Sequence, residues 1–235
     1  LDALDQRMRY GPRARGALSR RLEAASVSQF YLEAPARNDR ALLQRLAETD
    51  PDRENVGVIS FNQLLLVPDG KKPDALDGAT TLRVPRGWQF GTALPLGQKS
   101  FDVLAFQPAS LTTVIDSPVN MGRYFKRFAL DRDHGVSVAA DSEAALAVPD
   151  DMVTEWKQLV AEANALFGVR HYRKYEFLIT LSDHLEDFGL EHHESSDNRM
   201  SERALVDDDK RAYWASLLPH EYVHSWNGKY RRPAG

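Results

Sequence analysis

The sequence predicts an α+β protein in which a mostly antiparallel β domain precedes a part that mixes helices and strands. Short apolar stretches recur at near-regular spacing between residues 56 and 140, with Asp-Gly turns at 69–70 and 77–78. That rhythm is typical of an antiparallel sandwich or a large saddle-shaped sheet rather than of alternating βαβ units. After Pro149 the pattern changes to a long amphipathic helix, then to one strand and a second helical stretch.

The composition indicates a globular protein and excludes several classes of function. A chain of 235 residues with 43% hydrophobic and 27% charged residues can bury one large core or two small ones. The 30 basic residues are balanced by 34 acidic ones, which argues against a nucleic-acid-binding protein. We expect no membrane span, because no apolar run approaches the roughly 20 residues required. The absence of cysteine excludes disulfides, thiolate metal ligands and a cysteine nucleophile.

The first 55 residues form a charged segment of uncertain assignment, with candidate helices at 13–25 and 38–48. A β domain is expected to follow over residues 56–148. Its first strand is the apolar stretch 56–67, and the second is the alternating stretch 80–84. Further strands are expected at 88–90, 101–106, 111–115, 123–130 and 135–140.

We place a domain boundary near residues 145–150, so that the third unit covers residues 149–235. Asp150 or Asp151 would cap a helix whose apolar residues recur at helical spacing, and Gly168 would end it. Residues 175–181 are expected to form a strand, followed by a polar loop over 182–203. A helical stretch from about Asp208 then leads to residues 219–227.

The segment after Pro219 contains an H-E-x-x-H pattern made by His220, Glu221 and His224. On a helix, residues four apart leave the same face, so both imidazoles can hold one zinc ion while Glu221 acts as general base toward a water molecule. Pro219 is expected at the first helical position or at a kink. The alternative is an amphipathic helix end whose two histidines are only capped or solvated.

Two segments resemble a known family. Residues 219–233, Pro-His-Glu-Tyr-Val-His-Ser-Trp-Asn-Gly-Lys-Tyr-Arg-Arg-Pro, resemble the zinc-helix signature of the glycyl aminopeptidase family of zinc metallopeptidases. Residues 188–196, Phe-Gly-Leu-Glu-His-His-Glu-Ser-Ser, are similar to the block that precedes this helix in the family. The resemblance runs from about residue 56 to 235. It implies a thermolysin-like catalytic domain, a Zn²⁺ cofactor, and peptide substrates with an N-terminal Gly or Ala.

The same resemblance implies a substrate-binding role for Gly189, Leu190, Glu191 and His192. Glu191 would bind the free α-amino group, beside an edge supplied by strand 175–181 and the Gly-Leu-Glu stretch. A carboxylate in that place selects a protonated amine and so makes an exopeptidase. Phe188 stands where the related aminopeptidase signature has its first Gly, which leaves the geometry of this strand open.

A catalytic zinc site needs three protein ligands, and the chain places only two of them firmly. In the family the third is a Glu on the next helix, so we expect this chain to be an N-terminal fragment that binds zinc weakly. The downstream part of the catalytic domain, and a PDZ domain after it, would be its partners. His192, His193 and Glu194 are alternative ligands, although second-shell roles suit these adjacent residues better.

Two other functions remain open at this stage. One is a zinc endopeptidase of the same clan, and the other is a non-catalytic peptide-binding fragment. The compartment also remains open. Relatives with PDZ domains are often exported, which suggests a periplasmic location.

Overall fold

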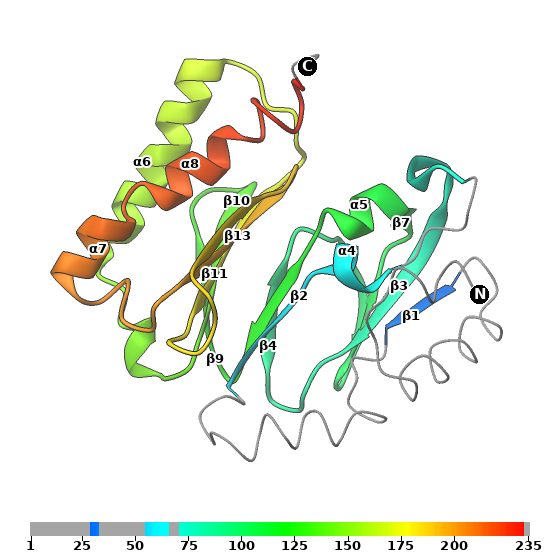
Figure 1. Ribbon diagram of the computed structural model, residues 1–235, viewed down its shortest axis with the longest axis horizontal. Coiled ribbons are helices and arrows are strands. Elements are labelled where there is room, and N and C mark those ends of the chain that lie inside the picture. The colour runs from blue at the N-terminus through cyan, green and yellow to red at the C-terminus, as the bar shows by residue number, and fades with distance from the viewer. Residues whose placement is uncertain (1–28, 33–54, 66–70, 233–235) are drawn as a thin grey trace.

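A computed structural model describes residues 29–32, 55–65 and 71–232. The helices predicted at 13–25 and 38–48 lie outside the described residues. Three sheets organise the described part of the chain, and Figure 1 shows them side by side, with the helices α6 and α8 covering the outer face of the last sheet. None of the described helices has both the length and the apolar composition needed to cross a membrane.

The first two sheets are mostly antiparallel, as the sequence predicts. One has the order β1-β3-β6-β5, with β7 beside β3, and only β1 runs parallel to its neighbour. The other has the order β2-β8-β4 and is antiparallel throughout. These strands are β1 (Gln29–Leu32), β2 (Val56–Ile59), β3 (Asp77–Arg83), β4 (Gln89–Thr92), β5 (Leu96–Ser100), β6 (Val103–Phe106), β7 (Ala109–Ser110) and β8 (Val119–Gly122).

Two strand predictions in this region are wrong. The stretch 56–67 is not one strand, because β2 ends at Ile59 and the short helix α4 (Phe61–Leu64) follows. Residues 111–115 form the helix α5 (Leu111–Ile115). The Ser110 hydroxyl accepts a hydrogen bond from the Thr113 amide at 3.2 Å, which caps the first turn, and buried Leu111 and Val114 have helical spacing. Capping and burial thus override the β-branched composition of this segment.

The third sheet is mixed and has the order β12-β13-β11-β10-β9. Its three central strands, β10, β11 and β13, run parallel. The helix α6 (Asp150–Phe167) crosses from β10 to β11 and is therefore the helix of a βαβ unit, which the regular strand spacing did not predict. The strands are β9 (Tyr124–Ala129), β10 (His134–Ala140), β11 (Tyr175–Leu181), β12 (Phe188–Glu191) and β13 (Ser195–Met200).

The predicted limit near residue 148 falls inside this arrangement. Strands β9 and β10, which the sequence assigned to the 56–148 unit, pair with each other and with β11 of the 149–235 unit. The domain limits remain predictions, and we propose to place the division between β8 and β9.

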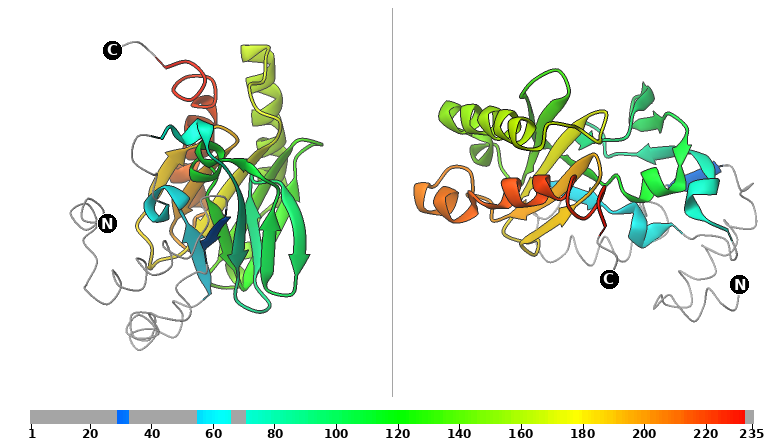
Figure 2. Two further views of the ribbon diagram at one scale, coloured as in Figure 1. Left: turned by 90° about the vertical axis from the view of Figure 1, so that its right-hand side faces the viewer. Right: turned by 90° about the horizontal axis from the view of Figure 1, so that it is seen from above.

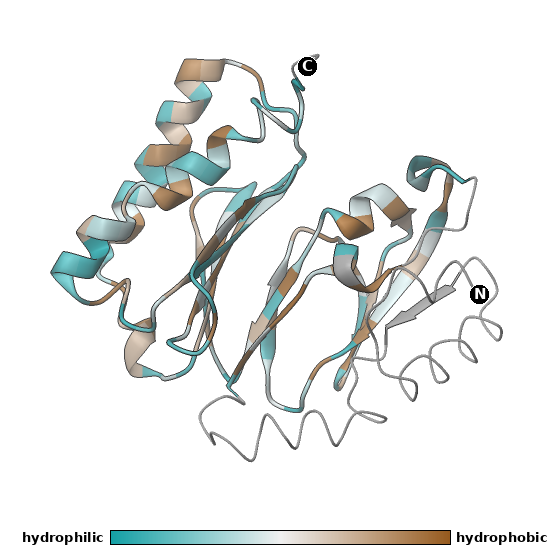
Figure 3. Ribbon diagram, viewed as in Figure 1, coloured by the Kyte–Doolittle hydropathy of each residue, from teal (hydrophilic) through white to brown (hydrophobic). Residues whose placement is uncertain are grey.

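The third sheet packs its apolar face against α6, α7 (Asp208–Trp214) and α8 (Leu217–Val223). In Figure 3 apolar and polar segments alternate along α6, as expected of a helix with one buried face, and Figure 2 shows α6 and α8 on the same side of the sheet. The opposite face of the sheet meets β2-β8-β4, where Asn120 Nδ2 donates to the carbonyls of Ser137 and Ile179 at 3.0 and 2.9 Å.

Three further sequence predictions for this part need correction. Pro149, not Asp150 or Asp151, occupies the N-cap of α6. The expected polar loop at 182–203 contains β12 and β13. The expected edge strand 175–181 lies in the middle of the sheet, and all of its residues are buried. Its continuous apolar sequence suits a strand covered on both faces.

Gly168 ends α6, as predicted, with a left-handed φ of 69°. A Cβ added there would meet nothing within 4 Å, so a substitution changes only backbone strain. We expect Gly168→Ala to lower the free energy of unfolding by about 1 kcal/mol. Gly168→Asn should lower it less, because Asn tolerates the left-handed region. Urea denaturation of the three proteins tests this expectation, and equal stabilities would contradict it.

Candidate active site

Helix α8 brings the two histidines of the H-E-x-x-H pattern together. His220 lies in its last turn, and His224 is the residue that ends it. Their Nε2 atoms are 3.2 Å apart. His224 Nδ1 lies 2.9 Å from the carbonyl oxygen of Asn227, an acceptor that fixes the proton on Nδ1 and leaves the Nε2 lone pair free for a metal. Pro219 is the third residue of the helix rather than the first, a place where its missing N–H costs little.

Two carboxylates adjoin His224. Ligand atoms of Glu191, Glu221 and His224 all lie within 4.8 Å of one another, which makes them the group of described residues able to hold a metal ion. His220 is not part of this group, although its Nε2 lies 3.2 Å from that of His224. The Glu221 side chain is buried, with 5% of the residue exposed. Burial raises the pKa of Glu221, and the negative charge of Glu191 adds to this, while His220 and His224 oppose it. A buried carboxylate with a raised pKa is suited to accept and release a proton.

Strand β12 places Glu191 in this group from the edge of the sheet. A Cβ at Gly189 would lie 2.8 Å from Leu217 Cδ1 and closer still to a Glu221 carboxylate oxygen, so any larger residue would displace the Glu221 and Leu217 side chains from their present positions. Residues two apart share a face of a strand, which turns Glu191 to the same side. Phe188 does not disturb the strand, because its ring packs under the Arg199 guanidinium at 4.9 Å and the strand pairs regularly with β13.

The sequence and the fold both match known aminopeptidases. The model of the peptidase M61 N-terminal domain matches residues 41–123, and that of the M61 glycyl aminopeptidase matches residues 213–235. The chain resembles the M61 glycyl aminopeptidases. The first of these matches ends one residue before β9, where strand pairing passes to the third sheet.

Among solved structures, an aminopeptidase N family protein from Idiomarina loihiensis is similar with a TM-score of 0.59 and 23% identity. The match covers 77% of this chain and 32% of that protein, so the chain spans about a third of its length. The leukotriene A4 hydrolase of yeast matches with a TM-score of 0.46 and 12% identity, over 74% of this chain and 29% of that one. The comparison with curated proteins gives no significant match.

The residues that follow Glu191 are placed by the turn after β12. His192 is the first residue beyond this strand, and its Nδ1 is 3.2 Å from Asp116 Oδ1. His193 Nε2 lies 2.6 Å from the His171 carbonyl oxygen, and Glu194 forms an ion pair with Arg173 at 2.8 Å. None of these three residues belongs to the Glu191–Glu221–His224 group. The substrate-binding roles of Leu190 and His192 remain predictions.

Asp116, at the end of α5, is the residue that sequence reasoning missed. Its carboxylate accepts hydrogen bonds from the His193 amide at 2.7 Å and from Lys229 Nζ at 3.0 Å, besides its contact with His192. Burial alone would raise the pKa of Asp116, but these hydrogen bonds and the Lys229 charge lower it below its usual value. The partners are 76 to 113 residues away in the chain, so no local pattern could have revealed them.

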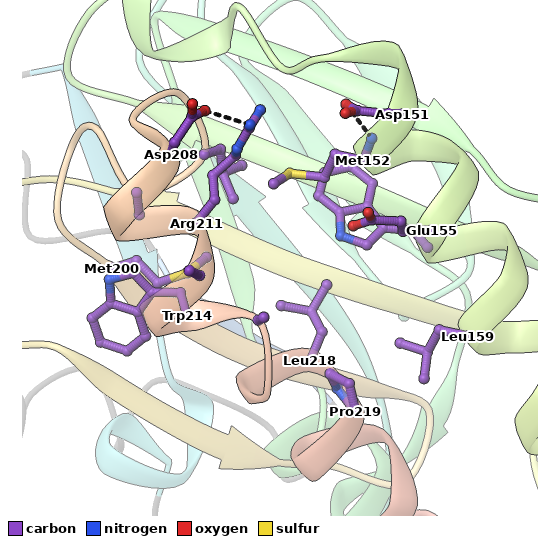
Figure 4. Close-up of a pocket in the computed structure, with 15 residues that line it drawn as sticks. Asp151, Met152, Glu155, Leu159, Met200, Asp208, Arg211, Trp214, Leu218 and Pro219 are labelled. Atoms are coloured by element: carbon purple, nitrogen blue, oxygen red, sulfur yellow. Dashed lines mark hydrogen bonds and ion pairs between the residues drawn. The ribbon is translucent and has the colours of Figure 1, made fainter.

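A separate cavity of about 380 Å³ lies between α6, α7 and α8 (Figure 4). Trp156, Met200 and Leu218 line it, and an ion pair between Asp208 and Arg211 stands at its rim. The cavity borders Pro219, but neither the two histidines nor the two glutamates of the site line it. The chemistry of the site therefore belongs to the α8–β12 junction rather than to this cavity.

The lowered pKa of Asp116 predicts a stability contribution that depends on pH. It should be complete above the unfolded-state pKa near 3.8 and should be lost below that value, as the pH falls through the lower folded-state pKa. At pH 7 we expect Asp116→Asn to cost roughly 1–3 kcal/mol, because charged hydrogen bonds are lost, and the cost should shrink near pH 3. Urea denaturation of both proteins at pH 7 and pH 3 measures this loss in the free energy of unfolding.

Asp102→Asn is the matched control, since Asp102 makes only a 3.8 Å surface ion pair with Arg83 and should cost under about 1 kcal/mol. An Asp116→Asn cost that is the same at both pH values would contradict the assignment.

Proposed function

We propose that this chain carries the metal-binding and N-terminus-binding parts of a zinc-dependent aminopeptidase, in which His220 and His224 hold zinc, Glu221 is the general base, and Glu191 binds the substrate amine. The observation that carries the proposal is the grouping of His224 with the carboxylates of Glu191 and Glu221 at the junction of α8 and β12, with His220 Nε2 3.2 Å from His224 Nε2. The match of residues 213–235 to the M61 glycyl aminopeptidases supports the same function.

The donor set suits zinc. Imidazole nitrogens and carboxylate oxygens are the ligands that zinc takes in catalytic sites when thiolates are absent. The Nδ1 contact of His224 with the Asn227 carbonyl is the kind of second-shell hydrogen bond that orients metal-bound histidines. Zinc held there would supply Lewis acidity toward a water molecule and the scissile carbonyl.

Glu221 would take a proton from the attacking water and pass it to the leaving amine. Its burial keeps bulk water from competing for the carboxylate, and its raised pKa brings it closer to the working range of a base. The neighbouring Glu191 keeps a negative charge close to the first residue of a substrate. An α-ammonium group can pair with that charge, whereas an internal peptide segment cannot.

The peptide would lie along β12, whose outer edge has backbone groups available for hydrogen bonds. Peptides with N-terminal Gly or Ala are the proposed substrates of the whole protein. Further proposed partners are the rest of the catalytic domain and a PDZ domain. The zinc endopeptidase of the same clan is the second candidate, and the short distance between Glu191 and Glu221 favours the aminopeptidase.

Zinc titration of the apo chain by calorimetry tests the metal site. We expect His220→Ala and His224→Ala each to abolish measurable binding, because each removes one of the imidazole ligands. His184→Ala, in the exposed loop after β11, is the control and should leave affinity unchanged. Binding that survives either of the first two changes would contradict the proposed site.

Glu191→Gln distinguishes between two possible roles of that carboxylate, binding of the substrate amine and coordination of zinc. An unchanged zinc affinity fits a carboxylate reserved for the amine, whereas a loss of tenfold or more would make Glu191 the third ligand in this chain.

Hydrolysis of glycyl and alanyl peptides by the whole protein tests the reaction. Glu221→Gln should lower kcat by about 10²–10⁴-fold, because the general base is lost while the shape of the side chain is kept. N-acetylation of the peptide should abolish turnover, since it removes the cation that Glu191 binds. Equal cleavage of free and acetylated peptides would point to the endopeptidase instead.

A further inference from the structure

A buried hydrogen-bond network behind α8 has no part in the proposed reaction. His134 and Tyr222 are 1% and 0% exposed, and Tyr172 is 8% exposed. The network joins the turn before β10, the segment between α6 and β11, and the helix α8. We call it the His–Tyr network, and its members are Asp131, His134, Tyr172 and Tyr222.

The contacts of the network define where each proton lies. His134 Nδ1 is 2.8 Å from Asp131 Oδ1, so this nitrogen donates to the carboxylate. Its Nε2 is then an acceptor, with the hydroxyls of Tyr172 at 2.8 Å and of Tyr222 at 3.0 Å. The two tyrosine hydroxyls also contact each other. One hydroxyl therefore donates to His134 and the other can donate to its neighbour, so every proton has an acceptor.

The surroundings make these bonds strong. Tyr222 packs against Tyr175, Phe177 and Trp226, with ring centroids 4.7, 5.1 and 5.1 Å away. Burial lowers the pKa of His134, although Asp131 opposes this, so the imidazole is kept neutral. A hydrogen bond between neutral groups in such an apolar setting is costly to leave unmade.

Tyr222 stands two residues from each histidine of the H-E-x-x-H pattern, which is about 200° around the helix. Its hydroxyl thus holds the face of α8 opposite to the imidazoles. We propose that the His–Tyr network fixes the rotation of α8 about its own axis and so orients the side chains of His220 and His224, with His134 as a positioning residue. The proposal rests on the proposed metal-binding role of the two histidines. Metal sites need their ligands held within about 10–20° of the working geometry.

The chain offers a matched pair of variants for the test. Tyr222→Phe removes the hydroxyl that ties α8 to His134. Tyr172→Phe removes a hydroxyl from the same network but leaves the Tyr222 hydroxyl 3.0 Å from His134 Nε2, free to donate to it. Co²⁺ affinity and the visible absorption spectrum of bound Co²⁺ report the geometry of the ligands. Amide hydrogen exchange in the apo chain reports how firmly α8 is held in place.

We expect Tyr222→Phe to weaken Co²⁺ binding by about tenfold or more, to change the Co²⁺ spectrum, and to speed exchange in α8. Tyr172→Phe should shift affinity by less than about threefold, because the bond from Tyr222 to His134 remains. Equal effects of the two variants, or no effect of Tyr222→Phe, would overturn the proposal.

His134→Asn gives a second route if Tyr222→Phe fails to fold. The Asn amide can still donate toward Asp131 but is too short to accept from Tyr222. We therefore expect the same weaker Co²⁺ binding and faster exchange in α8 as for Tyr222→Phe. Unchanged exchange in α8 would overturn the proposal. A wild-type chain that does not bind Co²⁺ would contradict the proposed function alone. The exchange measurement would still decide whether the network restrains α8.

Discussion

The structure depends on one helix that must be polar on one side and fully buried on the other. Helix α8 presents two imidazoles to the site while it buries Tyr222 against aromatic rings of β11. The pattern of residues around Tyr222 allows both demands to be met in seven helical residues and the C-cap residue His224. Such a short helix is unstable in isolation, so its geometry comes from tertiary packing rather than from intrinsic propensity.

The site is assembled from segments that lie far apart in the chain. The β domain takes part through Asp116, which binds both the turn after β12 and Lys229 beyond α8. A second link between the layers is Asn120, whose amide bonds to backbone carbonyls of β10 and β11. Both links are hydrogen bonds from buried or half-buried polar groups, which give a defined orientation that apolar contacts alone do not supply.

The sequence was most informative where a single segment determined the outcome. The helix that ends at Gly168, the strand at 175–181 and the helix that carries the H-E-x-x-H pattern follow from local spacing, although the strand lies in the middle of its sheet rather than at the expected edge. The strand prediction for residues 111–115 failed because these residues are rich in β-branched side chains, and propensity gives that composition more weight than the single capping serine.

Non-local features could not be predicted. The parallel pairing of β10 with β11 depends on a crossover through α6. The role of Asp116 and the partners of His134 depend on contacts between segments that only the fold brings together. Gly189 is intermediate: the resemblance drew attention to it, but only the structure shows that a larger side chain there would displace the Glu221 carboxylate.

The position of β12 has a consequence for solubility. An outermost strand with open backbone groups can receive an extended peptide, but it can equally recruit a strand from another copy of the chain. β12 has only four residues, and its neighbour α8 crowds it at Gly189. A brief, partly shielded edge of this kind can hold the end of a single chain, yet it offers too few consecutive bonds to start the growth of an intermolecular sheet.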